Sequence, residues 1–316
     1  MAVPIQLRST TLQNKIIVHQ ANEHNNKRDT RMIIDGHAHA SGNFLEPESI
    51  IDNLNKSGID KVILVPGELE SSKNYFLPNL ARLFPKNNVV KVTNLLTKFV
   101  IGIAGTVKQI PKGNEHVYNL TQRTNGRVIQ FIWITQQMKN PTEYLSEKFI
   151  EWKFKGVKLH QCWDNYSVDS DFFRMVAVWT EKNDLPLFIH LYSDNDVKLL
   201  IEYKKEHPKL KLIIAHLFGL ELFIKYDYKD DNLYFDTSTL QLTSTKRLID
   251  AITFVGATNV MFGTDTPYGK NNLQKNIDRI KNLDISSEEK DLILGENMKQ
   301  LLKIKKHEMT TTVSKS

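Results

Sequence analysis

The sequence contains one cysteine, no long hydrophobic run and no nucleotide-binding glycine pattern. Cys162 is the one cysteine among its 316 residues, so an intramolecular disulfide is excluded. The lack of disulfides favours a reducing compartment, and we expect a cytoplasmic protein. The most apolar stretch, residues 212–224, is interrupted by His216, Gly219 and Glu221, and no run approaches the ~20 apolar residues of a membrane helix. Dinucleotide-binding and P-loop motifs are absent, which excludes the common modes of nucleotide binding.

The net charge is moderately positive, +6 from 42 basic and 36 acidic residues. Many lysines stand among acids, as in residues 203–211 and 301–308, and no basic block is interleaved with aromatic residues. Such a pattern is typical of solvated helix faces rather than of a nucleic-acid interface. We therefore expect a small-molecule substrate and no nucleic-acid or membrane partner, and a homodimer is left open.

Short apolar, β-branched runs alternate with amphipathic stretches of helical period from about residue 31 to residue 300. The runs are nearly continuous in apolar character, as expected for parallel strands that are buried on both faces. Eight strand–helix repeats predict a (β/α)8 (TIM) barrel, slightly distorted, as a single domain over 31–305, with a doubly wound open sheet as the alternative. The predicted strands are 32–39, 61–66, 127–134, 156–160, 186–191, 211–216, 232–238 and 259–265.

Three segments fall outside this repeat. Residues 1–30 are polar and are expected to form an N-terminal extension, and residues 306–316 a disordered C-terminal tail. The connection after the second strand, 67–126, is far longer than usual and contains helical pieces at 74–84 and 92–102. An insertion at this end of a barrel commonly covers the active site, although extra packing is an alternative.

The strongest chemical signal is the sequence DGHAHA at 35–40. Side chains alternate along a strand, so His37 and His39 lie on one face and can both reach one cation. His190, His216 and Asp265 end the predicted fifth, sixth and eighth strands. The ends of parallel barrel strands meet at one mouth, so these side chains are expected to converge there. Three or more imidazoles with a carboxylate suit Zn²⁺ or a similar first-row ion.

This set of motifs resembles the amidohydrolase superfamily, and most closely its amidohydrolase-related (amidohydrolase 2-like) branch of metal-dependent hydrolases and decarboxylases. The resemblance covers about residues 31–302 and includes GENMKQLL at 295–302. It implies an enzyme that binds one or two divalent ions, zinc by preference, with manganese or another first-row metal as alternatives. The implied metal ligands are His37, His39, His190 and Asp265. His216 would either polarise substrate and relay protons or bind a second metal.

Further residues near the predicted strand ends have open roles. Lys158 and His160 share a face of the fourth strand. A resemblance to dihydroorotase-like enzymes implies a carbamylated Lys158 that bridges two metals, but a lysine that binds a substrate carboxylate or pairs with a carboxylate of the site is favoured. His160 and Trp163 are expected to line the site, Trp163 by stacking on substrate, although both could simply be packed. Cys162 is expected to be an inert thiol. Asp236 and Ser238 could orient ligands.

Two reactions fit these residues. The preferred one is hydrolysis of a small amide, lactone or ester by a metal-activated water, with Asp265 moving the proton and His216 polarising the carbonyl. The alternative is non-oxidative decarboxylation of an aromatic or unsaturated acid. That reaction benefits from a guanidinium that grips the carboxylate, and Arg82, Arg127, Arg174 and Arg247 are expected on helices or strand starts instead. A non-catalytic binding protein is disfavoured because all five metal-centre positions are intact.

Overall fold

The computed structural model describes residues 31–69, 75–104, 106–269 and 272–305. Apart from Arg31, these residues belong to one compact unit, Met32–Ser316. The predicted N-terminal extension, 1–30, and the predicted tail, 306–316, lie outside the described residues. Within those residues, no helix has both the length and the apolar character needed to cross a membrane.

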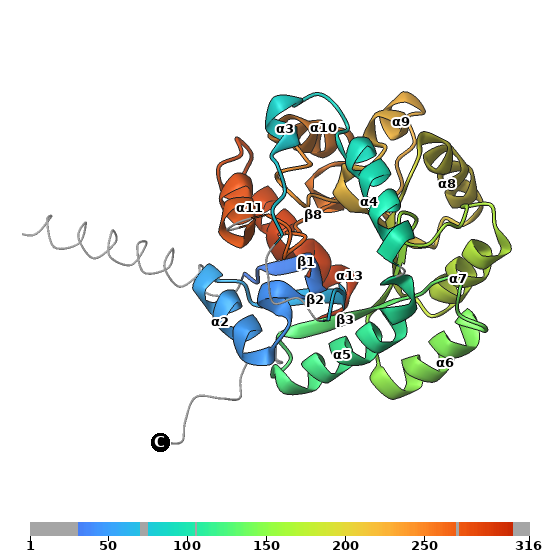
Figure 1. Cartoon of the computed structure of the whole chain (residues 1–316). Coiled ribbons are helices and arrows are strands. Elements are labelled where there is room, and N and C mark those ends of the chain that lie inside the picture. Colours follow the sequence, from blue (N-terminus) through green and yellow to red (C-terminus); the bar gives the residue numbers. More distant parts are fainter. Residues whose placement is uncertain (1–30, 70–74, 105, 270–271, 306–316) are drawn as a thin grey trace, which may run out of the picture. The chain divides into compact units, whose positions relative to one another are not determined.

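Eight parallel strands form one sheet in which each strand pairs with its neighbours in chain order (Figure 1). The sheet closes through hydrogen bonds between the first strand and the segment that follows the last strand. Gly36 N donates to Phe262 O (2.9 Å) and His39 N donates to Thr266 O (2.8 Å). The (β/α)8 barrel is thus confirmed. The strands are β1 Ile34–Ala40, β2 Lys61–Pro66, β3 Val128–Trp133, β4 Gly156–His160, β5 Pro186–His190, β6 Lys211–Ile214, β7 Leu233–Asp236 and β8 Val260–Met261.

Helices follow the strands, and their ends match local sequence signals. Pro47 opens the first helix and Gly58 ends it in the left-handed conformation (φ 66°), which glycine adopts without a side-chain clash. Apolar residues of the helices pack against the outside of the barrel in one large core. The longer helices are α2 Pro47–Ser57, α4 Val90–Ala104, α5 Ile110–Arg123, α6 Pro141–Trp152, α7 Asp171–Lys182, α8 Asp194–Glu206, α10 Thr245–Val255 and α11 Asn272–Lys281; the shorter are α3 Leu80–Leu83, α9 Leu220–Lys225, α12 Ser287–Asp291 and α13 Asn297–Leu301.

The long connection after β2 contains three helices with different positions. The last of them, α5, packs against β2 and β3 as an ordinary barrel helix. The middle one, α4, lies across the ring of strands (Figure 1) and contributes Thr93, Asn94 and Thr97 to a cavity at the strand ends. The expected covering role of this connection is therefore met by α4. The helix predicted over 74–84 is wrong for residues 75–79; only α3 is helical there, because Pro78 precedes it.

Among the strands that end earlier than predicted, β6 and β8 are the two whose last residues were expected to be His216 and Asp265. β6 ends at Ile214 and β8 at Met261, so the predicted ends at His216 and Asp265 are wrong. Both residues have positive φ, 58° for His216 and 56° for Asp265. A backbone in that conformation cannot continue a strand, and it redirects each side chain at the barrel mouth.

The closing GENMKQLL motif packs against the start of the barrel. Gly295 approaches the backbone so closely that a Cβ atom would lie 1.9 Å from Met32 O. Asn297 Nδ2 donates to Ala257 O (2.7 Å) and Val260 O (2.8 Å), which pins the segment before β8. Glycine and asparagine are thus required here for close approach and for hydrogen bonding.

Candidate metal centre

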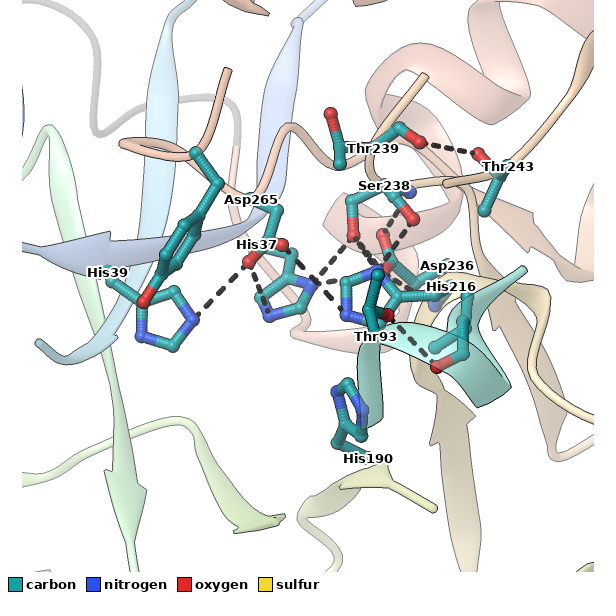
Figure 2. Close-up of polar contacts among 12 residues, drawn as sticks. His37, His39, Thr93, His190, His216, Asp236, Ser238, Thr239, Thr243 and Asp265 are labelled. Atoms are coloured by element: carbon teal, nitrogen blue, oxygen red, sulfur yellow. Dashed lines mark hydrogen bonds and ion pairs between the residues drawn. The ribbon is translucent and has the colours of Figure 1, made fainter. Parts of the chain in front are cut away.

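Three predicted ligands meet at the C-terminal end of β1. His37 Nε2 lies 3.6 Å and His39 Nε2 3.4 Å from Asp265 Oδ1. All three side chains are buried, and their ligand atoms lie within 4.8 Å of one another. Figure 2 shows the two imidazoles turned toward the Asp265 carboxylate. The structure therefore brings together residues that stand 228 positions apart (265 minus 37) in the sequence.

Hydrogen bonds to Nδ1 fix the tautomer of both histidines on β1. His37 Nδ1 lies 3.0 Å from Asp236 Oδ2, and since a carboxylate only accepts, Nδ1 carries the proton. His39 Nδ1 lies 2.8 Å from Pro66 O, and since a backbone carbonyl also only accepts, this Nδ1 carries the proton too. Each Nε2 is then left with its lone pair facing Asp265. Metal-binding histidines are commonly oriented in this way, by a carboxylate or a backbone carbonyl that accepts from the other ring nitrogen.

His216 approaches the opposite oxygen of the same carboxylate. Its Nδ1 donates to Ser238 O at 2.7 Å, which in the neutral ring makes Nε2 the acceptor, and Nε2 lies 4.0 Å from Asp265 Oδ2. Its backbone N donates to Asp236 Oδ2 at 3.2 Å. Asp236 thus binds both the His37 ring and the His216 backbone, as Figure 2 shows. The suggestion that Asp236 and Ser238 orient other site residues agrees with these contacts.

The charge state of this cluster suits a divalent cation. Burial acts to raise the pKa of Asp265, but His37, His39 and His216 together lower it to about 2, so the carboxylate is ionised at neutral pH. Burial, followed by the nearby Lys158, holds the pKa of His37 well below its usual range, so that imidazole is neutral. Neutral Nε2 atoms and a carboxylate oxygen are the donors that zinc and similar first-row ions take. The residues present therefore fit such an ion.

His190 does not join this group of three. Asn94, on α4, uses its Nδ2 to donate to Leu191 O at 2.9 Å, so its Oδ1 must be the acceptor for His190 Nε2 at 2.8 Å. The proton of His190 is therefore on Nε2, opposite to the tautomer of His37 and His39. Its ligand role stays a prediction that requires either its Nδ1 atom or release from Asn94.

Lys158 lies inside the barrel beneath the cluster, as expected for its face of β4. Its Nζ is 3.3 Å from His37 Nε2 and 3.9 Å from the centre of the Phe188 ring. Burial lowers the pKa of Lys158 to about 8, and the attraction of Asp265 and Asp236 only partly opposes that. The amine is thus positioned beside a predicted ligand atom; its role, bridging or substrate binding, stays a prediction.

Aromatic rings form one wall beside the cluster. The His160 ring stacks on His190 with centres 3.9 Å apart and on Trp133 with centres 5.4 Å apart. Trp163 is tilted against Trp133, with centres 5.1 Å apart. His160 and Trp163 both line the cavity, as predicted. The expected inert Cys162 is buried, which raises the pKa of its thiol to about 12 and leaves it protonated.

The cavity above these residues measures about 120 Å³. Sequence reasoning missed Asn94 and Tyr268, which both belong to it. A signal for Asn94 was available, because an amide inside an otherwise apolar helical pattern needs a buried partner. None of the four arginines considered above lines the cavity. Among the described residues, the cavity is lined by His37, His39, Leu77, Thr93, Asn94, Thr97, His160, Trp163, His190, His216, Leu242, Asp265 and Tyr268.

A family model and solved structures are similar to this chain over most of its length. The family model described as amidohydrolase matches residues 34–304. No curated protein gives a match. Among solved structures, a dihydroxybenzoic acid decarboxylase from Polaromonas sp. JS666, with bound manganese and 2-nitroresorcinol, is similar with TM-score 0.62 at 16% identity, over 87% of this chain and 97% of that one.

Two further solved structures of similar fold carry other activities in their names. A probable 2-pyrone-4,6-dicarboxylic acid hydrolase from Acinetobacter baumannii has TM-score 0.61 at 12% identity, over 86% of this chain and 99% of that one. A 4-oxalomesaconate hydratase from Rhodopseudomonas palustris has TM-score 0.58 at 14% identity, over 86% and 96%. At these identities the likeness shows the fold alone, and the reactions of the three proteins differ.

Proposed function

Because this chain belongs to the amidohydrolase family, we propose that it is a metal-dependent hydrolase of a small amide, lactone or ester. The observation that carries the proposal is the convergence of His37 Nε2, His39 Nε2 and Asp265 Oδ1 at the barrel mouth. Because each ring donates through Nδ1, both Nε2 atoms are unprotonated in the neutral rings; that of His37 also lies 3.3 Å from Lys158 Nζ, which a bound cation would displace. A buried site that gathers such donors is a candidate for metal-assisted catalysis.

The cofactor that we propose is a single first-row divalent ion held by His37, His39 and Asp265. Imidazole donors favour zinc; manganese, which is bound in the similar decarboxylase structure, is the alternative. When bound, the ion supplies Lewis acidity and lowers the pKa of water. A second ion, at His216 and Asp236 beside His37 or with a carbamylated Lys158, is the other arrangement that these donors would permit.

Asp265 and His216 would handle the protons. The Asp265 carboxylate, ionised at neutral pH, accepts a proton from the attacking water and returns it to the leaving group. His216 Nε2 faces that carboxylate at 4.0 Å as an acceptor, because its Nδ1–H is used by Ser238 O. It would polarise the substrate carbonyl as an N–H donor after taking up a proton from solvent, while Asp265 alone carries the proton of the attacking water to the leaving group.

Hydrolysis is preferred over decarboxylation because none of the described residues that line the cavity carries a guanidinium. The nearby cation, Lys158, is fully buried and does not line the cavity, so it is poorly placed to bind a substrate carboxylate. Decarboxylation of an aromatic acid stays as the second candidate. The aromatic wall formed by Trp163, Tyr268 and the His160 ring favours it, since flat rings stack there.

Paired variants test the proposal. In His37→Ala/His39→Ala we expect loss of the metal and of turnover in a panel of small esters, lactones and amides, with the far-ultraviolet circular dichroism unchanged. His207→Ala is the matched control, because that partly exposed imidazole pairs with Glu181 far from the cavity. Turnover that persists in the metal-free double variant would reject metal catalysis. Release of CO2 from aromatic acids without ester or amide cleavage would favour the second candidate.

A further inference from the structure

Helices α3 and α4 present a concentration of apolar side chains to solvent. Among the described residues, they and their flanks carry seven of the thirteen large hydrophobic residues recorded as exposed. The other six are spread over α6, α7, α9, α10 and the residue after α9, as is ordinary for a protein surface. We call the seven the α3–α4 face: Phe76, Leu83, Phe84, Val92, Leu95, Leu96 and Phe99, with exposed fractions from 54% to 89%.

The exposed side of α4 is built as a second apolar stripe. Val92, Leu95, Leu96 and Phe99 follow the spacing i, i+3, i+4, i+7, which aligns them on one side of a helix. The helix already has an inward side, where Asn94 is buried against His190 and the chain after it. Packing against the barrel therefore accounts for the inward side of α4 but not for the apolar residues on its outward side. Exposed apolar residues gathered on one side of a helix indicate an interaction surface.

The charge of this segment indicates what the surface meets. Residues 75–114 contain six basic residues and no acidic one, although the whole chain is nearly balanced. Arg82 and Lys86 are exposed and are close in sequence to Leu83 and Phe84, whereas Lys91 pairs with Asp194 of the barrel. A second copy of the chain would bring two faces of the same positive sign together, which is unfavourable. An apolar surface with anionic groups is complementary to both features.

We propose that the α3–α4 face binds peripherally to the surface of an anionic phospholipid bilayer. Leu95, Leu96 and Phe99 would enter the boundary between headgroups and acyl chains, while Arg82 and Lys86 contact lipid phosphates. Such a combination of a short apolar face with a few basic residues gives reversible binding. The inner side of α4 lines the cavity, so a bound bilayer would adjoin the candidate metal centre. We expected no membrane partner because lysines and acidic residues are mixed along most of the chain. That pattern does not reveal the excess of basic residues over 75–114.

Sedimentation with sucrose-loaded vesicles tests the proposal on the full chain. We expect binding to phosphatidylcholine vesicles that contain 30% phosphatidylglycerol, much weaker binding to pure phosphatidylcholine, and a decrease as salt is raised, because screening weakens the attraction of the basic residues. No sedimentation of the wild-type chain with the anionic vesicles would overturn the proposal. Equal binding to both vesicle types would also overturn it.

Two pairs of surface variants locate the contact. Leu95→Gln/Phe99→Gln and Arg82→Gln/Lys86→Gln should each reduce partitioning about tenfold or more. The matched controls are Ile150→Gln, an exposed apolar residue on α6, and Lys139→Gln/Lys155→Gln, exposed lysines outside the face; these should bind like the wild-type chain. Partitioning that the first two variants retain would refute the assignment to this face. A wild-type dimer in light scattering that Leu95→Gln/Phe99→Gln dissociates would refute it in favour of self-association.

Discussion

Replacing Asp236 by asparagine tests whether the orientation of His37 controls the metal centre. Asp236 Oδ2 accepts from His37 Nδ1 at 3.0 Å and from His216 N at 3.2 Å. Asparagine keeps the size of the side chain but can turn its NH2 group toward Nδ1. The ring proton would then move to Nε2, and the lone pair that faces Asp265 would be lost.

The size of the effect follows from the burial and number of these contacts. Asp236 is 2% exposed, so water cannot replace the missing acceptor. Removing a partner that orients a metal-binding histidine typically lowers metal affinity about 10- to 100-fold, which corresponds to about 1.4–2.7 kcal/mol. We expect Asp236→Asn to lie toward the weaker-binding end, since the same carboxylate also holds the His216 backbone.

Competition with a chromophoric chelator measures this affinity for zinc and for manganese. The control is Asp164→Asn, which removes another buried carboxylate. The Oδ2 atom of Asp164 accepts from Gln136 N (2.5 Å) rather than from an imidazole. The metal affinity of this variant should equal that of the wild-type chain. An Asp236→Asn variant that binds either ion as tightly as the wild-type chain would refute the reasoning. So would equal losses in both variants, which would indicate a general loss of stability.

Three further outcomes are expected. Asn94→Leu should lower the free energy of unfolding by about 1–3 kcal/mol in urea titrations, because the buried His190 N–H loses its acceptor; an unchanged midpoint would contradict that bond. Gly295→Ala, whose Cβ would meet a backbone oxygen at 1.9 Å, should cost about 3 kcal/mol or more, against about 1 kcal/mol for Gly58→Ala, which has open space but positive φ. Burial holds the pKa of His160 well below its usual range, so the unfolded chain binds the proton first. Stability from this residue is therefore complete above pH ~6.5 and is lost as pH falls. His160→Gln should reduce the slope below that pH by about 1.4 kcal/mol per unit, as measured by urea unfolding of the metal-free protein; an unchanged slope would show that His160 is charged in the folded state.

The barrel could be predicted because its strands are buried on both faces. Lys61–Pro66 is apolar after its first residue and Gly156–His160 is apolar apart from Lys158 and His160, and the structure has strands with the same bounds. Pattern reasoning failed where the chain leaves the sheet. Phe262 and Thr264 remain apolar or β-branched past the end of β8, but their backbones bind elements other than the β7 ladder, with Phe262 N donating to Ile293 O at 2.9 Å. Hydrophobicity alone does not distinguish these partners.

The metal-centre residues were predictable to the extent that they belong to strands. His37 and His39 have the alternation that puts both on one face, and Lys158 lies inside the barrel as its register requires. The partner of His190 was not predictable, because Asn94 is 96 positions away (190 minus 94) on an inserted helix with no fixed relation to the strands. The tautomer of an imidazole depends on such a partner. Residue spacing can therefore identify ligand candidates before it can say which nitrogen each offers.

Closure of the barrel and assembly of the metal centre depend on the same residue. The backbone oxygen of His37 accepts from Asp265 N at 2.7 Å and from Thr264 N at 3.2 Å, which ties the segment after β8 to β1. The His37 ring faces the carboxylate of that same Asp265. The positive φ of Asp265 allows its amide and its carboxylate to meet His37 at two places. A sheet that failed to close here would therefore separate the carboxylate from both imidazoles of β1, so the ligand geometry is a consequence of the fold's last strand pairing.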